Sequence, residues 1–224
     1  MAELYLIRHA QASFGAANYD KLSPLGHEQS RALGRALKEQ GVTPTHFWRG
    51  EMTRHRETLD GIQEGLGQTG DAEIHTGLNE FNFTELLEAR YASGAGGAAP
   101  DNMHTERKTH FRTLRDTVLE WERGGIPGAV ESWGDFSARS QAAFAAMADP
   151  AHECVLAVSS GGAIARIIAS LLECGAGQQI KLQLQMKNCA VNRFVYSSRS
   201  TYLHGFNETP HITAANQARL LTYS

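Results

Sequence analysis

Cysteines and long apolar runs are both scarce in this chain, and each scarcity excludes a class of protein. Of 224 residues only three are cysteines, at Cys154, Cys174 and Cys189. Their number is odd and no two have CxxC spacing, which argues against a disulfide framework and against a zinc knuckle. Nowhere do about 18 apolar residues follow one another, so no membrane-spanning helix is predicted. The first residues also lack a basic region followed by a long apolar core, so we expect a cytoplasmic protein.

A strong excess of charge of one sign is missing as well. The formal net charge is -3, with 21 basic and 24 acidic side chains. This balance gives no electrostatic footprint for a nucleic acid or an acidic membrane, so neither is an expected partner. No GxGxxG or P-loop pattern follows a predicted strand, which argues against a nucleotide-binding protein. Any anion-binding site must therefore be formed by a few basic side chains close together, not by the overall charge of the protein.

What the chain does contain is a regular alternation of apolar runs and amphipathic segments. Residues 4–7 and 154–158 are apolar runs of the kind that form buried strands. Further strands are expected at about 46–48, 73–76, 191–196 and 201–204, and helices at about 24–40, 53–66, 105–123, 131–147 and 164–171. This order favours an α/β fold, a three-layer α/β/α sandwich with a mostly parallel sheet, in a single domain over 1–224. The segment from about 83 to 128 breaks the alternation and predicts an inserted helical cap over the carboxyl edge of the sheet.

Four short polar motifs follow the predicted elements in order. Arg8-His9 closes the first strand, and Arg54 lies at the start of the helix after the second strand. Glu80 lies in a Leu-Asn-Glu-Phe sequence, and Ser160 lies in a Ser-Ser-Gly-Gly sequence after the 154–158 strand. Ligands of open α/β sheets collect at the carboxyl ends of the strands. An imidazole there can act as a nucleophile, and a guanidinium beside it can hold an anion.

This ordered set of motifs resembles the histidine phosphatase superfamily, the group that includes the cofactor-dependent phosphoglycerate mutases. The resemblance covers nearly the whole chain and includes the segments 22–26, 131–133 and 206–211. It implies that His9 is the nucleophile, which takes the phosphoryl group to form a phosphohistidine. Arg8 and Arg54 would clamp the phosphate oxygens. Glu80 would protonate the leaving alkoxide and then activate the attacking water.

The function that the resemblance implies is hydrolysis of a phosphomonoester, in the manner of a histidine-type acid phosphatase. No metal ion and no cofactor are expected, and the partner is a small phosphorylated molecule. The alternatives are a catalytically impaired phosphate-binding or regulatory protein on the same scaffold, and a phosphomutase. The charges of the 83–128 segment favour no single leaving group. A homodimer is the default expectation for the oligomeric state, because two-fold dimers are the commonest assemblies.

The chain departs from the family pattern at residues that would hold the phosphate. Ala10 stands where the family usually has glycine, and Ser13 is expected to offer a hydroxyl to the phosphate. The usual Ser-His-Gly after the last buried strand is Ser159-Ser160-Gly161 in this chain. The second histidine, which normally hydrogen-bonds the phosphoryl group, is therefore missing. The backbone turn at Gly161 is still expected to face the anion.

Three interpretations of Ser160 follow from this departure. Its hydroxyl donates the lost hydrogen bond, which gives a weaker phosphatase. Another residue, such as His204 or His211 from the C-terminal segment, takes the place of the missing histidine. Alternatively, the site binds phosphate but turns over poorly or not at all. Loss of one oxyanion-type donor typically costs about 100- to 1000-fold in rate.

Overall fold

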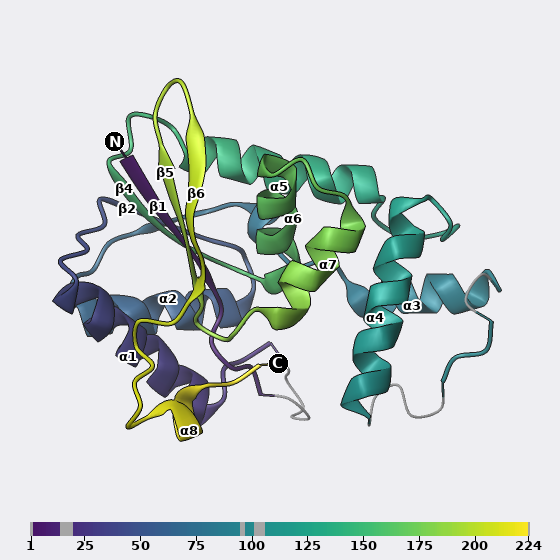
Figure 1. The fold of residues 1–224 in the computed structure, drawn as a ribbon, viewed down its shortest axis with the longest axis horizontal. Helices are drawn as coiled ribbons and strands as arrows, with labels where there is room; N and C mark the ends of the chain where they lie inside the picture. Colours follow the sequence, from purple (N-terminus) through teal and green to yellow (C-terminus); the bar gives the residue numbers. More distant parts are fainter. Residues whose placement is uncertain (1, 14–19, 95–96, 101–105, 224) are drawn as a thin grey trace.

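The structure, a computed structural model, describes residues 2–13, 20–94, 97–100 and 106–223 (Figure 1). Its strands are β1 (Ala2–Arg8), β2 (His46–Arg49), β3 (Ala72–Ile74), β4 (Cys154–Ser159), β5 (Val191–Tyr196) and β6 (Thr201–Glu208). Its helices are α1 (Pro24–Glu39), α2 (Thr53–Leu66), the 3-10 turn η1 (Thr76–Leu78), α3 (Phe83–Ala92), α4 (Arg107–Glu122), α5 (Trp133–Met147), α6 (Gly161–Leu171), α7 (Ala176–Gln185) and α8 (Gln217–Leu220). Most of these elements match the expected ones, whereas η1, α7 and α8 were not predicted, and α3 was expected only as part of a helical cap.

The strands form one six-stranded sheet in the order β3-β2-β4-β1-β5-β6. Strands β3, β2, β4 and β1 pair in parallel with one another in that order, whereas β5 pairs antiparallel with both β1 and β6. The prediction of a mostly parallel sheet is therefore confirmed. The carboxyl ends of β1, β2 and β4 lie at the same edge, where the polar motifs begin.

Helices cover both faces of the sheet, as the alternation of side chains along β1 requires. Leu4 and Leu6 are fully buried in a cluster that includes residues of α5 and α6. Tyr5 and Ile7 point to the opposite face and pack with residues of α1 and α2. Burying an aliphatic side chain of this size stabilises a fold by roughly 1.5–3 kcal/mol. The α/β/α sandwich is thus built from both faces of β1, and the predicted three layers are confirmed.

The first helix begins where the sequence predicts. Ser23 caps it by accepting a hydrogen bond of 3.0 Å from the Gly26 N–H, and Pro24 occupies the first turn. Helix α1 packs so closely on α2 that a Cβ at Gly34 would lie 2.2 Å from the carbonyl oxygen of Ile62. Only glycine fits this contact. It fixes the position of α2, whose first turn carries Arg54.

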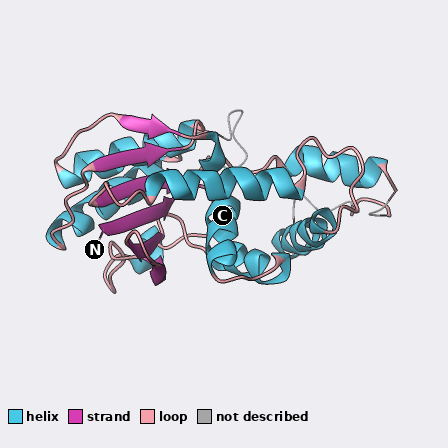
Figure 2. Ribbon diagram, turned by 90° about the horizontal axis from the view of Figure 1, so that it is seen from above, coloured by secondary structure: helices cyan, strands magenta, loops and turns pink. Residues whose placement is uncertain are grey.

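The segment for which a cap is predicted holds α3 and α4, which lie apart from the sheet (Figure 1). Figure 2 shows the strands gathered in one half of the molecule, with helices and loops in the other half. An ion pair of 2.8 Å between Arg90 and Glu120 joins α3 to α4. Phe81, Trp121 and Phe136 belong to a third apolar cluster, which joins these helices to the layer of α5 and α6. None of the described helices is long and apolar enough to cross a membrane.

Candidate active site

The register of two central strands brings the first and last motifs together. Arg8 pairs with Ser159 across β1 and β4, so His9 and Ser160 leave neighbouring strands at the same level. The backbone N–H of His9 donates to the carbonyl oxygen of Ser159 at 2.9 Å, which extends this pairing by one residue. Both His9 and Ser160 are buried. The two motifs therefore face one small volume at the carboxyl edge of the sheet.

The protonation of His9 is set by its surroundings. Its Nδ1 lies 2.8 Å from the carbonyl oxygen of Ala10, and because a carbonyl only accepts, Nδ1 must hold the proton. Burial in the first place, and then the charges of Arg54 and Arg8, hold the pKa of His9 well below its ordinary value. The imidazole is therefore neutral, with the lone pair on Nε2. This is the form that a nucleophilic histidine requires.

The two arginines come from different elements and are both buried to more than nine-tenths. Arg8 ends β1 and donates through its guanidinium to the carbonyl oxygen of Met186. Arg54 lies in the first turn of α2 and donates to Asp20 at 2.7 Å, while the backbone N–H of Thr53 donates to the same carboxylate. Asp20 therefore fixes both the start of α2 and the guanidinium of Arg54.

Glu80 follows η1 and reaches the turn that begins α6. Its Oε2 accepts a hydrogen bond of 2.9 Å from the backbone N–H of Gly162. A Cβ at position 162 would lie 2.1 Å from Glu80 Oε1, so the close approach requires glycine. Burial raises the pKa of Glu80, and the Gly162 N–H together with Arg54 and Arg8 opposes the rise. A carboxyl of this kind can exist protonated and still be surrounded by cations.

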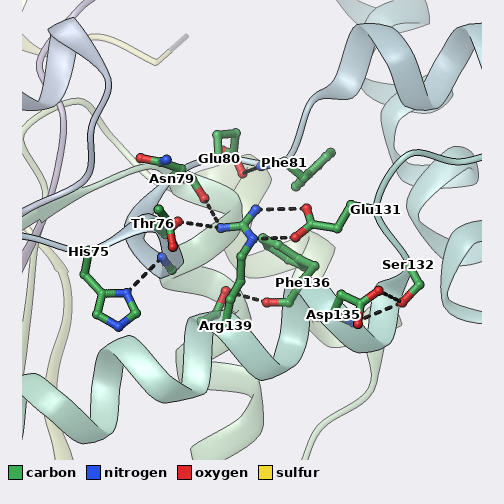
Figure 3. Close-up of polar contacts among 12 residues, drawn as sticks. His75, Thr76, Asn79, Glu80, Phe81, Glu131, Ser132, Asp135, Phe136 and Arg139 are labelled. Carbon is green, nitrogen blue, oxygen red and sulfur yellow. Dashed lines mark hydrogen bonds and ion pairs between the residues drawn. The ribbon is translucent and has the colours of Figure 1, made fainter.

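Arg139 of α5 holds the loop in which Glu80 lies (Figure 3). Its guanidinium donates to the carbonyl oxygens of Thr76 and Asn79, at 3.0 and 2.8 Å, and forms a two-point ion pair with Glu131. The Asn79 carbonyl belongs to the peptide immediately before Glu80. Arg139 and Glu131 therefore position the carboxyl from outside the site.

Comparison with known proteins identifies the family of the chain. The family model described as histidine phosphatase superfamily (branch 1) matches residues 4–209. The chain belongs to the histidine phosphatase superfamily. It is 25% identical over 200 residues to a probable phosphoglycerate mutase of Erwinia tasmaniensis, a match that covers 86% of this chain and 84% of the relative.

Solved structures of the superfamily share the fold. One is a phosphoglycerate mutase of Bacillus anthracis, with a TM-score of 0.66 at 20% identity, covering 94% of each chain. Another is a phosphoserine phosphatase variant of Entamoeba histolytica in complex with phosphoserine. Its TM-score is 0.65 at 18% identity, covering 95% of this chain and all of that one. Relatives and structural neighbours of this member of the superfamily thus include both mutases and phosphatases.

The structure brings most of the predicted site residues together. The charges of Arg54 and Arg8 lower the pKa of both His9 and Glu80, so the two arginines lie near both groups. A Cβ at Gly161 would lie 3.5 Å from Arg8 Nε, so the glycine turn also borders this cluster.

Ser13 is the predicted residue that the structure does not tie to the cluster. Its backbone N–H donates to the carbonyl oxygen of Lys21 at 2.8 Å, and residues 14–19 of the same loop lie outside the described residues. The role of Ser13 as a phosphate ligand stays a prediction.

The histidine that reaches Ser160 is one that the sequence analysis missed. His55 Nε2 lies 2.7 Å from Ser160 Oγ, and both side chains are fully buried. The ring centroids of His55 and His9 are 5.9 Å apart. His204 is exposed on β6, and neither ring nitrogen of the buried His211 has a hydrogen-bond partner among the described residues. The one signal in the sequence was the position of His55 directly after Arg54.

The positive charge of the site comes from arginine side chains. Among the residues that the structure describes, no group of three or more His, Cys, Asp or Glu side chains is arranged to hold a metal ion. The charge of the cluster comes instead from guanidinium groups, which suit planar, multidentate contacts with phosphate oxygens.

Proposed function

We propose that the protein is a metal-independent phosphomonoester hydrolase that works through a phosphohistidine at His9. The observation that supports this most strongly is the state of His9: buried, neutral, and with its only proton held on Nδ1 by the Ala10 carbonyl. Arg54 and Arg8 lower the pKa of His9 through their charge, which supports a role for both in holding a phosphate dianion beside the imidazole. Membership of the superfamily is consistent with this chemistry.

In the first step, the lone pair of His9 Nε2 attacks phosphorus and the bond from phosphorus to the ester oxygen breaks. Arg8 and Arg54 neutralise the charge spread over the phosphoryl oxygens, which is the main contribution a protein makes to such a transition state. The proton of Glu80 passes to the departing alkoxide, so the alcohol leaves neutral. A phosphate dianion beside Glu80 raises the pKa of its carboxyl further, in addition to the effect of burial.

In the second step, water attacks the phosphohistidine. The carboxylate of Glu80 accepts a proton from that water, and the bond from phosphorus to nitrogen breaks. Inorganic phosphate leaves, and both Glu80 and neutral His9 are restored. The same carboxyl acts first as acid and then as base, as microscopic reversibility requires.

The proposal is tested by phosphate release from p-nitrophenyl phosphate with EDTA present. We expect turnover that EDTA does not reduce. A hydrolase rather than a mutase is proposed because Ser160 replaces the histidine that helps stabilise phosphate in the pocket. If the protein binds inorganic phosphate but releases none from any ester, it is a phosphate-binding protein on this scaffold. If phosphate is instead moved from one position of phosphoglycerate to another, it is a mutase.

The pH dependence of turnover follows from the two shifted groups. The pKa of His9 is lowered, so the imidazole stays neutral well into acid, whereas the pKa of Glu80 is raised, so its acid form persists to higher pH than usual. The rate therefore falls as pH rises through the pKa of Glu80, and this fall lies at higher pH than for an ordinary glutamate. Profiles of turnover rate against pH, for the natural protein and for Glu80→Gln, measure this pH dependence.

Replacing Glu80 by Gln should abolish the decrease of the rate with rising pH. It should also lower turnover of an alkyl phosphate by about 100- to 10,000-fold. The loss should be smaller for an aryl phosphate, because a phenolate leaves without needing a proton. Glu88→Gln, an exposed position on α3, serves as the control. Equal losses for both kinds of ester would contradict the role of Glu80 as the acid.

A further inference from the structure

His55 and Ser160 together stand where the superfamily's second histidine is missing. We propose that they form a hydrogen-bond relay, in which His55 orients the Ser160 hydroxyl toward the transferring phosphoryl group. This rests on the proposed function and adds a residue to it. The contact that supports the relay is the 2.7 Å approach of His55 Nε2 to Ser160 Oγ, between two fully buried side chains.

The side chain of Ser160 does not cap the helix that it precedes. Ser160 is the N-cap of α6, a position from which serine normally accepts a hydrogen bond from the first turn. Here it makes no such bond, and the N–H of Gly162 donates to Glu80 instead. The hydroxyl of Ser160 is held by His55, beside the turn that borders the Arg8 guanidinium.

The direction of the hydrogen bond follows from the other ring nitrogen of His55. Burial, aided by the charges of Arg54 and Arg49, holds the pKa of His55 well below its ordinary value, so the ring has one proton. Nδ1 is buried without a partner among the described residues. A buried N–H without an acceptor is rarer and costlier than an unfilled lone pair, so the proton belongs on Nε2.

His55 Nε2–H therefore donates to Ser160 Oγ. The Ser160 hydroxyl can then donate its own proton to a different acceptor, such as a phosphoryl oxygen. Arg8 borders the adjacent turn at Gly161, and Arg54 directly precedes His55 on α2; both are residues proposed to hold the phosphate. The relay thus delivers one neutral donor to the phosphoryl oxygens, fixed in direction by a buried imidazole. Fixed donors of this kind act chiefly on the transition state.

The test compares His55→Leu, which removes the donor at similar volume, with His55→Gln, whose amide can donate from nearly the same place. Ser160→Ala and the double variant His55→Leu/Ser160→Ala complete a cycle. We expect kcat to fall about 100-fold in His55→Leu and in Ser160→Ala, with little further loss in the double variant. His55→Gln should recover most of the rate. Thermal melting of each variant is measured in parallel.

Three results would overturn the relay: unchanged turnover in His55→Leu, losses that multiply in the double variant, or equal losses in His55→Leu and His55→Gln. Affinity for inorganic phosphate is measured on the same variants; the losses should be smaller than those in kcat, because the donor acts chiefly on the transition state, and they should again fail to add in the double variant. If the natural protein and His9→Ala release phosphate equally well, the proposed function fails, and the affinity for phosphate still decides whether the relay exists.

A cavity beside Glu80 indicates which leaving groups the protein accepts. A cavity of about 280 Å³ lies between the Glu80 loop, α3 and the start of α5, and Glu80 is part of its wall. Glu80 also accepts a hydrogen bond from the Gly162 N–H, so the residue proposed to protonate the leaving oxygen belongs both to the cavity wall and to the α6 turn. Phe81, Leu86 and Trp121 supply apolar walls.

The charged groups of the cavity wall are mainly acidic. Glu80, Glu85 and Glu131 line it, and Arg139 is the only basic residue among the described lining residues. Arg139 and Glu131 offset each other's charge in a two-point ion pair. Glu80 is the proposed acid, so Glu85 is the acidic side chain of the wall whose charge remains. We infer, given the proposed function, that the leaving alcohol is uncharged or cationic and partly apolar. An alcohol with a carboxylate or a second phosphate would be repelled.

The test measures kcat/KM for phosphorylcholine and for phosphoglycerate. We expect the natural protein to favour phosphorylcholine by at least about 10-fold, which corresponds to about 1.4 kcal/mol. Glu85→Lys should shift this ratio toward phosphoglycerate, whereas Glu88→Lys, the same charge change at an exposed site on the same helix, should not. A natural preference for phosphoglycerate, or equal shifts in both variants, would overturn the inference. If neither ester is hydrolysed, the proposed function fails, and calorimetric affinities for the two esters give the same comparison.

Discussion

Replacing His9 by Ala should reduce turnover of an aryl phosphate by roughly 10,000- to 1,000,000-fold, the range seen when a nucleophile is removed from an enzyme. His9 is the group on which both steps of the proposed reaction depend, because it forms the bond to phosphorus and releases it to water. Its neighbours cannot replace it. The Ser160 hydroxyl is held by His55, and His55 itself has its Nε2 engaged in that contact. Turnover is measured with EDTA present, at the acid side of neutral.

The matched control is His204→Ala, which removes an exposed imidazole from the edge strand β6. We expect it to keep the activity of the natural protein. His9→Ala should also keep its affinity for inorganic phosphate within a small factor, because Arg8, Arg54 and the α6 turn remain. Substantial turnover by His9→Ala would refute the phosphohistidine mechanism, whatever the other variants show.

Replacing Arg54 by Ala should lower kcat/KM by roughly 1000-fold or more, the range reported for a guanidinium that stabilises a transferring phosphoryl group. Arg54 is buried in the first turn of α2 and is held by Asp20 at 2.7 Å. Its removal also takes away one of the charges that hold the pKa of His9 low. The acid limb of the pH profile should therefore move to higher pH, in addition to the loss of rate.

Arg56 provides the control, since it lies two residues further along the same helix and is exposed. Arg56→Ala should change kcat/KM by less than a factor of about 2, as surface substitutions do. Arg54→Lys should recover only part of the loss, because an ammonium lacks the planar fork that binds two oxygens. Full activity in Arg54→Lys would mean that charge alone is needed, and full activity in Arg54→Ala would remove Arg54 from the site.

The positions of the main site residues could be predicted because each follows directly from a strong local signal. The apolar run of β1 ends at Arg8-His9, and the apolar run of β4 ends at Ser160. Parallel strands bring their carboxyl ends to one edge, so the two motifs were expected together. Ser23 and Pro24 likewise predicted the start of α1, and the capping bond is present.

The role of His55 could not be predicted, because it depends on the order of strands rather than on any local pattern. The sheet places β2 beside β4, although about a hundred residues separate them in the sequence. The first turn of α2, which follows β2, thereby lies beside the turn after β4, and His55 meets Ser160. A sequence shows that His55 follows Arg54 but not which strand its helix will face.

Helix α7 was missed for a different reason. Its buried residues are Ala176, Gln179 and Ile180, so a glutamine occupies a position where the helical pattern needs an apolar side chain. Ile180, Leu182 and Leu184 also alternate with polar side chains, a period-two pattern typical of a strand, so the local pattern does not single out a helix. Tertiary contacts then decide the structure, here through the cluster in which Ala176 and Ile180 pack with cap residues such as Trp121.

The phosphohistidine itself is the most direct test of the proposed mechanism. The protein is mixed with an aryl phosphate, quenched in alkali within one turnover, digested, and examined by mass spectrometry for a phosphoryl group on each histidine. We predict a phosphoryl group on His9, which disappears as product phosphate accumulates and which never forms in His9→Ala. Continued turnover with His9 unmodified, or a phosphoryl group on another residue such as Ser160, would contradict the mechanism.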